Sequence, residues 1–442
     1  MPAVAHPVRD HCLAPDRPID APIAPVEGRY GRAFPDLPPL TGDDAALLAL
    51  GAAGGMCDGS DATGDDGLAA AGWPFFGQFI AHDLTADRSP IGPHVDADTI
   101  ANFRSPRANL ECLYGNGPIG APYLYDAGDP SKLLAEDGDV PRNSQGIALV
   151  GDPRNDVHVF ISQLHRALIG AHNHLADRLR EDGVAAEDCF DAARRATMWH
   201  YQWIIVEDYL PTLVGRDLVE EVKDPARRCY RAAGTPIIPF EFADAAFRYG
   251  HGQIRHRYRL RSGGDEYGVF PDLVGFRPVA PEHRIEWRLL FGDDAQRAKR
   301  MDGRLAASLI ALPMAITGAV DVEAYHSLAA RDLQRGAAIG LPSGEAIARK
   351  IGAQPLTAAQ AGLAAFGWSG ETPLWLYVLR EADVRGGGDR LGEVGGRLVA
   401  EVLLGLIDAD PESYRALEPD WQPTLPASGE RFELLDLLLA GA

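Results

Sequence analysis

The chain has 442 residues, of which 46% are hydrophobic, so it can bury a large core and lacks the composition of a disordered protein. Its 63 Asp and Glu residues outnumber its 42 Lys and Arg residues and give a formal net charge of −21. A surface this acidic argues against binding to nucleic acid and against docking on anionic lipid, because both are polyanions.

Neither a signal peptide nor a membrane span is evident in the sequence. No apolar run reaches the roughly 18 residues of a transmembrane helix, and the first residues lack a basic segment followed by an apolar one. We therefore expect a cytoplasmic protein without a membrane span, and secretion stays open as the alternative. The cysteines lack the CxxC spacing of zinc and iron–sulfur sites, so we expect free thiols. They are Cys12, Cys57, Cys112, Cys189 and Cys229.

Residues 1–70 are rich in Pro, Gly, Asp and Ala, which predicts an extended arm and loops. Farther along the chain, apolar residues recur at helical spacing, and this pattern predicts amphipathic helices. We expect these helices over residues 73–84, 158–181, 188–213, 240–256, 304–317, 343–351, 357–366, 373–382 and 388–407. The clearest strand signal covers residues 257–261. The expected fold is all-α, with very little β-structure.

Capping residues mark two of the helix starts. Thr357 with Gln360 matches a capping box. Ser343 with Glu345 places a cap and a first-turn acid ahead of a helix that is expected to stop at Gly352.

The predicted helix over residues 73–84 carries polar side chains on a predominantly apolar segment. Gln78 and His82 are four residues apart and project into the same space, whereas Asp83 points about 100° away. Side chains of one helical turn therefore point toward two different sites. The alternative is a His and a Gln whose hydrogen bonds are satisfied inside the core.

The positions of the other histidines indicate whether they could bind a metal ion or a ligand. His158, His165 and His172 recur every seven residues, so successive members lie about 10.5 Å apart along a helix, too far to share one metal ion. His251 stands between Gly250 and Gly252, which remove side-chain bulk as a closely approaching flat ligand would require.

Several motifs taken together in chain order carry a resemblance. They are the Gly-Gln-x-x-x-His-Asp helix ending at Asp83, the Gly-Asp-x-Arg turn ending at Arg154, the Tyr-Gly-His segment ending at His251 and the Asp-x-x-Arg pair ending at Arg335. The chain resembles the animal haem peroxidase family, also called the peroxidase–cyclooxygenase superfamily, in one of its bacterial branches.

The resemblance extends from about Gly28 to Tyr414. It implies one large, mainly helical catalytic domain over residues 71–442, with residues 1–70 wrapped on it as an arm. This expectation replaces the two or three domains that length alone suggests.

The resemblance makes His82 the distal histidine, Gln78 its neighbour and Arg154 the distal arginine. Cleavage of hydrogen peroxide needs a base that takes a proton from one peroxide oxygen and returns it to the other. A fixed guanidinium stabilises the negative charge that develops on the leaving hydroxide. The resemblance therefore implies a haem peroxidase with these catalytic residues.

On the proximal side, the resemblance makes His251 the ligand of the haem iron. Asp332 stands where better-known animal members carry Asn, and its carboxylate is expected to lower the iron's reduction potential. Arg248 and Arg335 match arginines that face the haem propionates.

Asp83 matches an acid that binds calcium behind the distal helix. The resemblance implies that the other oxygen ligands come from Ser105, the Arg107 carbonyl, Asn109 and Glu111. Asn109 and Glu111 depart from the family pattern, so the alternative is a polar loop without an ion.

Ala81 and Val157 stand where mammalian members carry the Asp and Glu that form ester bonds to haem. Neither side chain can form an ester. We therefore expect non-covalent haem b and weak or no chloride oxidation.

The cyclooxygenase branch uses a Tyr three residues before the proximal His, where this chain has Arg248. We therefore expect a peroxidase that uses hydrogen peroxide and a small organic electron donor. Two alternatives stay open: a haem-dependent oxygenase acting on a lipid or secondary metabolite, and a non-catalytic haem-binding helical protein. No pattern indicates the oligomeric state.

Overall fold

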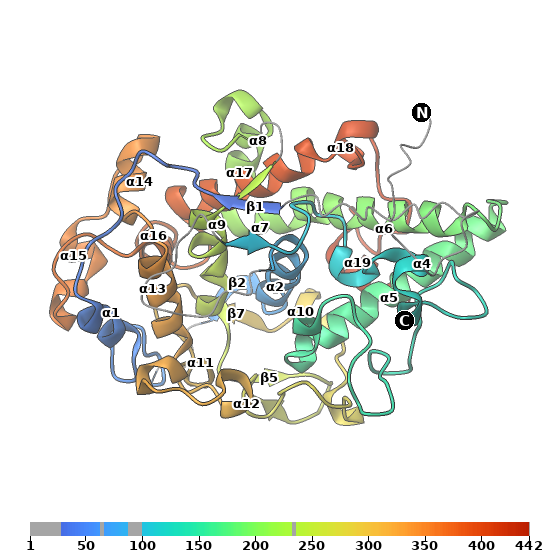
Figure 1. Ribbon diagram of the computed structural model, residues 1–442, viewed down its shortest axis with the longest axis horizontal. Coiled ribbons are helices and arrows are strands. Elements are labelled where there is room, and N and C mark those ends of the chain that lie inside the picture. Colours follow the sequence, from blue (N-terminus) through green and yellow to red (C-terminus); the bar gives the residue numbers. More distant parts are fainter. Residues whose placement is uncertain (1–27, 62–65, 87–99, 232–235, 442) are drawn as a thin grey trace.

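The computed structural model describes residues 28–61, 66–86, 100–231 and 236–441. Helices dominate these residues and the strands are short, which confirms the predicted mainly helical fold (Figure 1). Cys12 and the beginning of the predicted arm lie outside the described residues.

The longer helices build the body of the protein. In Figure 1, α2 lies near the centre, α5 and α6 extend to one end, and α13, α14 and α16 lie at the other. These helices are α1 (Asp44–Gly51), α2 (Trp73–Leu84), α5 (Val159–Glu181), α6 (Cys189–Ile204), α8 (Arg216–Lys223), α13 (Leu328–Ala338), α14 (Gly344–Ile351), α16 (Leu374–Gly386) and α17 (Glu393–Ala409).

Short helical turns connect the longer helices. The short α-helices are α3 (Glu111–Tyr114), α4 (Gly117–Gly120), α7 (Leu210–Val214), α9 (Phe240–Ala243), α10 (Arg288–Phe291), α11 (Ala307–Ile310), α12 (Met314–Thr317), α15 (Ala358–Ala361), α18 (Tyr414–Leu417) and α19 (Leu434–Leu439). The 3₁₀ turns are η2 (Pro122–Leu124), η3 (Pro153–Asp156), η5 (Pro225–Arg227), η6 (Ala246–Gln253), η7 (Pro281–His283), η8 (Glu323–His326) and η9 (Leu363–Phe366), and η4 (Ile205–Tyr209) is a π-helix.

The described strands form small sheets in the orders β3-β1-β4, β2-β7 and β5-β6. Strand β1 pairs antiparallel with β3, where Gly28 lies opposite Asn102, and parallel with β4, where Tyr30 lies opposite Ile238. The strands are β1 (Gly28–Gly31), β2 (Asp66–Ala70), β3 (Ala101–Asn102), β4 (Ile237–Pro239), β5 (Tyr258–Arg259), β6 (Glu266–Tyr267) and β7 (Arg297–Lys299).

The most strongly periodic and best capped helices match the predictions. Helix α5 fills the range 158–181, and His158 caps it. Ser343 caps α14, which ends at Gly352 in the left-handed conformation with φ 81°. The capping box of Thr357 and Gln360 is formed, with both of its hydrogen bonds.

Three predicted helices are wrong in type or length. Residues 240–256 form the short helix α9 followed by the 3₁₀ turn η6 rather than one α-helix. The helix predicted over 304–317 is split into α11 and α12 at Pro313, which lacks the N–H that a continuous helix needs. The helix over 357–366 breaks at Gly362, whose φ of 79° only glycine adopts readily.

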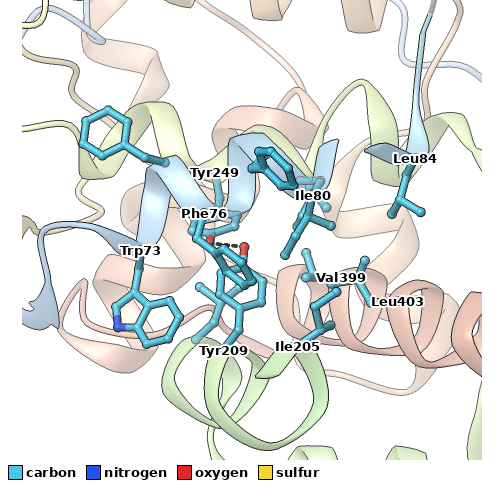
Figure 2. Close-up of a cluster of buried hydrophobic side chains, with 14 of the residues drawn as sticks. Trp73, Phe76, Ile80, Leu84, Ile205, Tyr209, Tyr249, Val399 and Leu403 are labelled. Atoms are coloured by element: carbon cyan, nitrogen blue, oxygen red, sulfur yellow. Dashed lines mark hydrogen bonds between the residues drawn. The ribbon is translucent and has the colours of Figure 1, made fainter. Parts of the chain in front are cut away.

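Helix α2 is embedded in the core, and Figure 2 shows the face that it presents. Gly77 allows this packing, because a Cβ there would meet the Tyr209 hydroxyl at 2.6 Å. The labelled residues of the cluster are Trp73, Phe76, Ile80, Leu84, Ile205, Tyr209, Tyr249, Val399 and Leu403. Tight packing on this face fixes the direction in which the polar residues of α2 point.

The described part of the predicted arm is packed on the rest of the chain. Strand β1 pairs with β4, and α1 lies against α13 so closely that a Cβ at Gly51 would meet the Ala330 backbone nitrogen at 2.4 Å. The division at residue 70 stays a prediction. The cysteines within the described ranges are free, and no helix of those ranges is both long and apolar enough to cross a membrane.

Candidate functional site

Helix α2 sends His82 toward the segment that follows Gly151. The His82 side chain is buried, with 8% of its surface exposed, and its Nδ1 lies 2.7 Å from Oδ1 of Asn155. Burial, together with the positive charge of Arg154, lowers the pKa of His82 to about 3. The imidazole is therefore neutral at ordinary pH, as a proton acceptor must be.

Gln78 lies one turn before His82 and bonds to a different histidine. Its Oε1 lies 2.9 Å from Nε2 of His158, the residue that caps α5. Burial lowers the pKa of His158 to about 3, so this imidazole is neutral. Its Nδ1 accepts from the Ile161 backbone nitrogen at 3.4 Å, which leaves Nε2 to donate to the amide oxygen of Gln78. Gln78 and His82 thus both bond to residues within the short segment 155–158.

Arg154 in η3 is held by one carboxylate and two backbone carbonyls. Its Nε and Nη2 donate to Asp152 at 3.0 and 2.8 Å, and Nη2 also donates to the carbonyl oxygens of His82 at 3.0 Å and Thr85 at 2.5 Å. Burial raises the pKa of Asp152, but Arg154 and Arg104 outweigh it and hold that pKa below its ordinary range. The guanidinium is therefore fixed next to His82 while 38% of its side chain stays exposed.

The other candidate histidine, His251, lies in η6 and bonds to a carboxylate. Its Nδ1 lies 2.5 Å from Oδ2 of Asp332, which comes from α13 and is fully buried. The indole nitrogen of Trp375 donates to the Arg248 carbonyl at 3.3 Å and ties η6 to α16. The structure thus brings together His251 and Asp332 as the sequence predicted.

Arg248 and Arg335 are bound by carboxylates of the chain itself. Arg248 donates to Asp332 and to Asp244, both at 3.1 Å, and Arg335 donates to Asp244 at 2.9 Å. Burial raises the pKa of Asp244 to about 6, and Arg248 opposes this shift. Asp244 was not among the residues predicted from the sequence, although its spacing of four residues before Arg248 is that of an ion pair.

Tyr30 in β1 interacts electrostatically with residues of both groups. Burial and the Asp244 carboxylate raise the pKa of its phenol, whereas the charges of Arg154, Arg335 and Arg248 lower it. One phenol is therefore within electrostatic range of the distal and the proximal arginines.

The glycines beside His251 lie against other elements of the protein. A Cβ at Gly252 would meet the Leu379 side chain at 3.0 Å, which is tighter than usual. A Cβ at Gly250 would make ordinary contact with Pro74 at 3.5 Å. The nearest protein neighbours are thus α16 and α2, and the expectation that the two glycines clear space for a flat ligand stays a prediction.

The predicted calcium ligands are engaged with protein groups. Asp83 is fully buried, and its two oxygens accept hydrogen bonds from the backbone nitrogens of Leu110 at 2.9 Å and Cys112 at 3.2 Å. Burial raises the pKa of Asp83 to about 7, against the effect of these amides. Asp83 thus turns away from His82, as predicted, but ties α2 directly to α3.

A guanidinium occupies the centre of the loop that was expected to bind calcium. Arg104 donates to Glu111 at 3.0 Å, to the Gly151 carbonyl at 3.0 Å and to Asp152 at 2.5 Å. Glu111 also accepts from the Ser105 hydroxyl, whose oxygen accepts from the Asn109 amide.

Arg107 pairs outside this set with Asp410 at 3.3 Å. Over the described ranges, no group of three or more His, Cys, Asp or Glu side chains is arranged to hold a metal ion. The residues fit an arginine-centred loop better than a calcium site.

The three regularly spaced histidines of α5 have separate partners. His158 bonds to Gln78, and His165 bonds to Asn155. His172 bonds to the Tyr114 hydroxyl at 3.0 Å and to a backbone carbonyl. This is consistent with the expectation that they share no metal ion.

Comparison with known proteins connects this geometry to one family. The family model described as animal haem peroxidase matches residues 122–361, a range that includes Arg154, His251 and Asp332. Heme peroxidase 2 of Caenorhabditis elegans is 32% identical over 128 residues, covering 27% of this chain and 18% of that protein. Human lactoperoxidase is 28% identical over 186 residues, covering 40% and 25%. The chain thus spans only part of the length of these relatives.

Two solved structures share the fold over most of the chain. Peroxidase A from Dictyostelium discoideum has a TM-score of 0.64 and 16% identity, and the match covers 90% of each chain. A fatty acid alpha-dioxygenase from Arabidopsis thaliana has a TM-score of 0.60 and 14% identity, and covers 93% of this chain and 80% of that one. At such identities the likeness establishes the fold and leaves the activity to the site.

Proposed function

Because this chain belongs to the animal haem peroxidase family, we propose that it is a haem-dependent peroxidase that reduces hydrogen peroxide and oxidises small organic donors in one-electron steps. One observation carries the proposal. His82 has a buried neutral imidazole and a backbone carbonyl that accepts from the fixed guanidinium of Arg154, and a second imidazole, His251, is paired with a buried carboxylate. A peroxide site on haem needs one histidine of each kind.

The proximal residues fit a haem group. Nδ1 of His251 is occupied by Asp332, while Nε2 has no hydrogen-bond partner among the described residues, and 29% of the side chain is exposed. Nε2 would hold the iron, and Asp332 would strengthen the ring as a ligand. Arg248 and Arg335 would approach the propionates, although Asp244 already offsets part of their charge.

Haem, when bound, supplies the electrons that reduce peroxide and regains them singly from organic donors. The chain's own task is proton transfer. The ring nitrogen of His82 that does not face Asn155 takes the proton from one peroxide oxygen and returns it to the leaving oxygen. Arg154 stabilises the negative charge on the leaving oxygen until that proton arrives.

A non-covalent haem b is part of this proposal. Ala81 and Val157 offer only hydrocarbon side chains at the positions of the ester-forming acids. We expect acidified organic solvent to extract the haem completely, and we expect little chlorination of an acceptor in the presence of peroxide and chloride. Haem that stays with the protein after extraction, or robust chlorination, would contradict this part.

An oxygenase is the alternative, and the structure gives it less support. Arg248 occupies the position of the radical-forming tyrosine and is held by Asp244 and Asp332. The neighbouring Tyr249 is buried and bonds to the Tyr209 hydroxyl at 2.6 Å (Figure 2). Consumption of dioxygen without added peroxide would support the oxygenase.

The absorption spectrum of the haem-loaded protein, before and after one equivalent of hydrogen peroxide, tests the function. We expect a shift of the Soret band within milliseconds to seconds, followed by its return when a phenol is added. The variant His82→Ala should keep the band and lose the rapid shift. His174→Ala, a change on α5 away from the site, serves as the control. The proposal would be contradicted if the wild-type protein bound no haem, or if its absorption spectrum did not change when peroxide was added.

A further inference from the structure

Behind the distal histidine lies a chain of hydrogen bonds that ends on a second buried histidine. Asn155 Oδ1 lies 2.7 Å from Nδ1 of His82, and Asn155 Nδ2 lies 3.0 Å from Nδ1 of His165. Asn155 is fully buried and His165 is 1% exposed. The three residues come from α2, η3 and α5, so the chain joins three separate elements.

The chemistry of the amide gives this chain a direction. An amide oxygen only accepts hydrogen bonds and an amide nitrogen only donates them. His82 must therefore carry its proton on Nδ1, and His165 must leave Nδ1 unprotonated and carry its proton on Nε2. The lone pair of His82 is then on Nε2, the nitrogen that faces away from Asn155.

The opposite orientation of the amide would have the opposite effect. His165 would then donate from Nδ1, and His82 would have to accept at Nδ1 and carry its proton on Nε2. In that tautomer His82 could not take a proton at Nε2. The orientation of one buried amide thus decides whether His82 is a base at the nitrogen that matters.

We propose that Asn155, oriented by His165, is a positioning residue that fixes His82 in the tautomer with a proton on Nδ1 and a lone pair on Nε2. The proposal deepens the proposed peroxidase function and rests on it, since it concerns the base of that reaction. It also gives a role to His165, which the sequence analysis had only excluded as a metal ligand.

Two contacts hold the pair in place. The backbone nitrogen of Asn155 donates to the Asp152 carbonyl at 2.9 Å, which fixes its position in η3 directly after Arg154. The His165 ring meets the edge of Phe79 from α2, with ring centroids 6.3 Å apart. The same helix that carries His82 therefore also limits how the His165 ring can turn.

Neutron diffraction from crystals of the haem-loaded protein tests the proposal directly, because it locates deuterium and distinguishes the amide nitrogen from its oxygen. We expect deuterium on Nδ1 of His82 and on Nε2 of His165, with Nδ2 of Asn155 directed at His165. Deuterium on Nε2 of His82, or the reversed amide, would overturn the proposal whatever the activity of the protein.

Kinetics on variants test the consequence. Asn155→Leu should lower the rate constant for the reaction with peroxide by about tenfold to a hundredfold at every pH, with unchanged haem content, as loss of a residue that orients a catalytic ring does. His165→Leu should have a smaller effect in the same direction. The control is His172→Leu, which removes a buried histidine of the same helix that is bonded only to Tyr114 and Ser131, and which should keep the wild-type rate.

A double-mutant cycle separates positioning from general damage. In the His82→Ala background, Asn155→Leu should have no further effect on the rate, since there is no imidazole left to orient. An equal loss in both backgrounds would overturn the positioning role. If the wild-type protein itself fails to react with peroxide, the proposed function fails, while the neutron result still decides the tautomer.

Discussion

The two candidate histidines of this site differ in the partner that each one bonds to. His82 bonds to the neutral amide of Asn155, whereas His251 bonds at 2.5 Å to the buried carboxylate of Asp332. A carboxylate pushes an imidazole toward the imidazolate and strengthens it as a metal ligand. An amide fixes the ring without adding charge, so the ring can take up a proton and release it again. The same residue type thus suits two roles.

The arginines of the two sides differ less. On the proximal side, Arg248 and Arg335 share Asp244, and Arg248 also reaches Asp332, so the carboxylates balance the guanidinium charges. On the distal side, Arg154 forms an ion pair with Asp152, and 38% of its side chain is exposed. Both sides thus pair their arginines with carboxylates of the chain, and Arg154 is the more exposed, at 38% against 31% for Arg248.

The largest expected effect comes from exchanging either histidine. His82→Ala should retain haem and lower the rate constant for the reaction with peroxide by about 10² to 10⁴, the range that general acid–base catalysis contributes. His251→Ala should instead weaken the retention of haem itself. Stopped-flow kinetics and haem titration distinguish the two. If both variants lost haem equally, or if His82→Ala reacted at the wild-type rate, the contrast would be lost.

Asp332→Asn should make the proximal side resemble the distal one. The amide still accepts from His251, but it no longer pushes the ring toward imidazolate, so the reduction potential of the iron should rise by on the order of 60 mV, a tenfold change for a one-electron couple. Spectroelectrochemical titration measures this. Asp244→Asn is the matched control, since Asp244 contacts Arg248 and Arg335 but not the histidine. Equal shifts in both variants would attribute the effect to net charge rather than to the hydrogen bond.

Lowering the pH should destabilise the distal side, because its hydrogen bonds depend on uncharged imidazoles. The folded protein holds the pKa of His158 at about 3, below its ordinary 6.5, so between these values the folded state binds fewer protons than the unfolded state. The stability that His158 contributes is therefore present above pH 6.5 and is lost as the pH falls.

His158→Gln should accordingly be less stable than wild type at pH 7, and the difference should shrink by about 2 kcal/mol at pH 5. Urea unfolding at both pH values measures this. Phe160→Leu is a nearby core substitution without a titratable group. It should lower the free energy of unfolding by the same amount at both pH values. If the difference in free energy of unfolding between His158→Gln and wild type did not change with pH, the buried ring would not be held neutral.

The local half of this site could be predicted from the sequence. The helical period separates His82 from Asp83, and the structure indeed bonds them to different segments, Asn155 on one side and the Leu110 and Cys112 amides on the other. The ends of α14 and the capping box of α15 followed from their capping residues, which act within one turn.

The partners of the site residues could not be predicted in this way. Asn155 lies 73 residues from His82, and the Arg104 contact with Asp152 spans 48 residues. A single sequence carries no signal for such pairs beyond the chemistry of each member. The 3₁₀ turn that carries His251 was mistaken for an α-helix because apolar spacing of three residues fits both types.

The smallest expected effect is that of calcium, and it bears on the distal side alone. Arg104 is 11% exposed and bonds to Glu111, Asp152 and a backbone carbonyl, so a cation already neutralises the acids of this loop. We expect the melting temperature to stay the same when a chelator or millimolar calcium is added. Arg104→Gln should lower it, because Glu111 and Asp152 lose their cation.

Arg107→Gln removes the cation beside Asp410, whose side chain is 1% exposed, and should also lower the melting temperature. A calcium-dependent rise in the melting temperature of the wild-type protein would show that the loop opens for an ion after all. Asp83 would then have to exchange its backbone partners, Leu110 and Cys112, for the metal, and the link between α2 and α3 would become ion-dependent. Only in that case would the position of the distal helix depend on a bound metal.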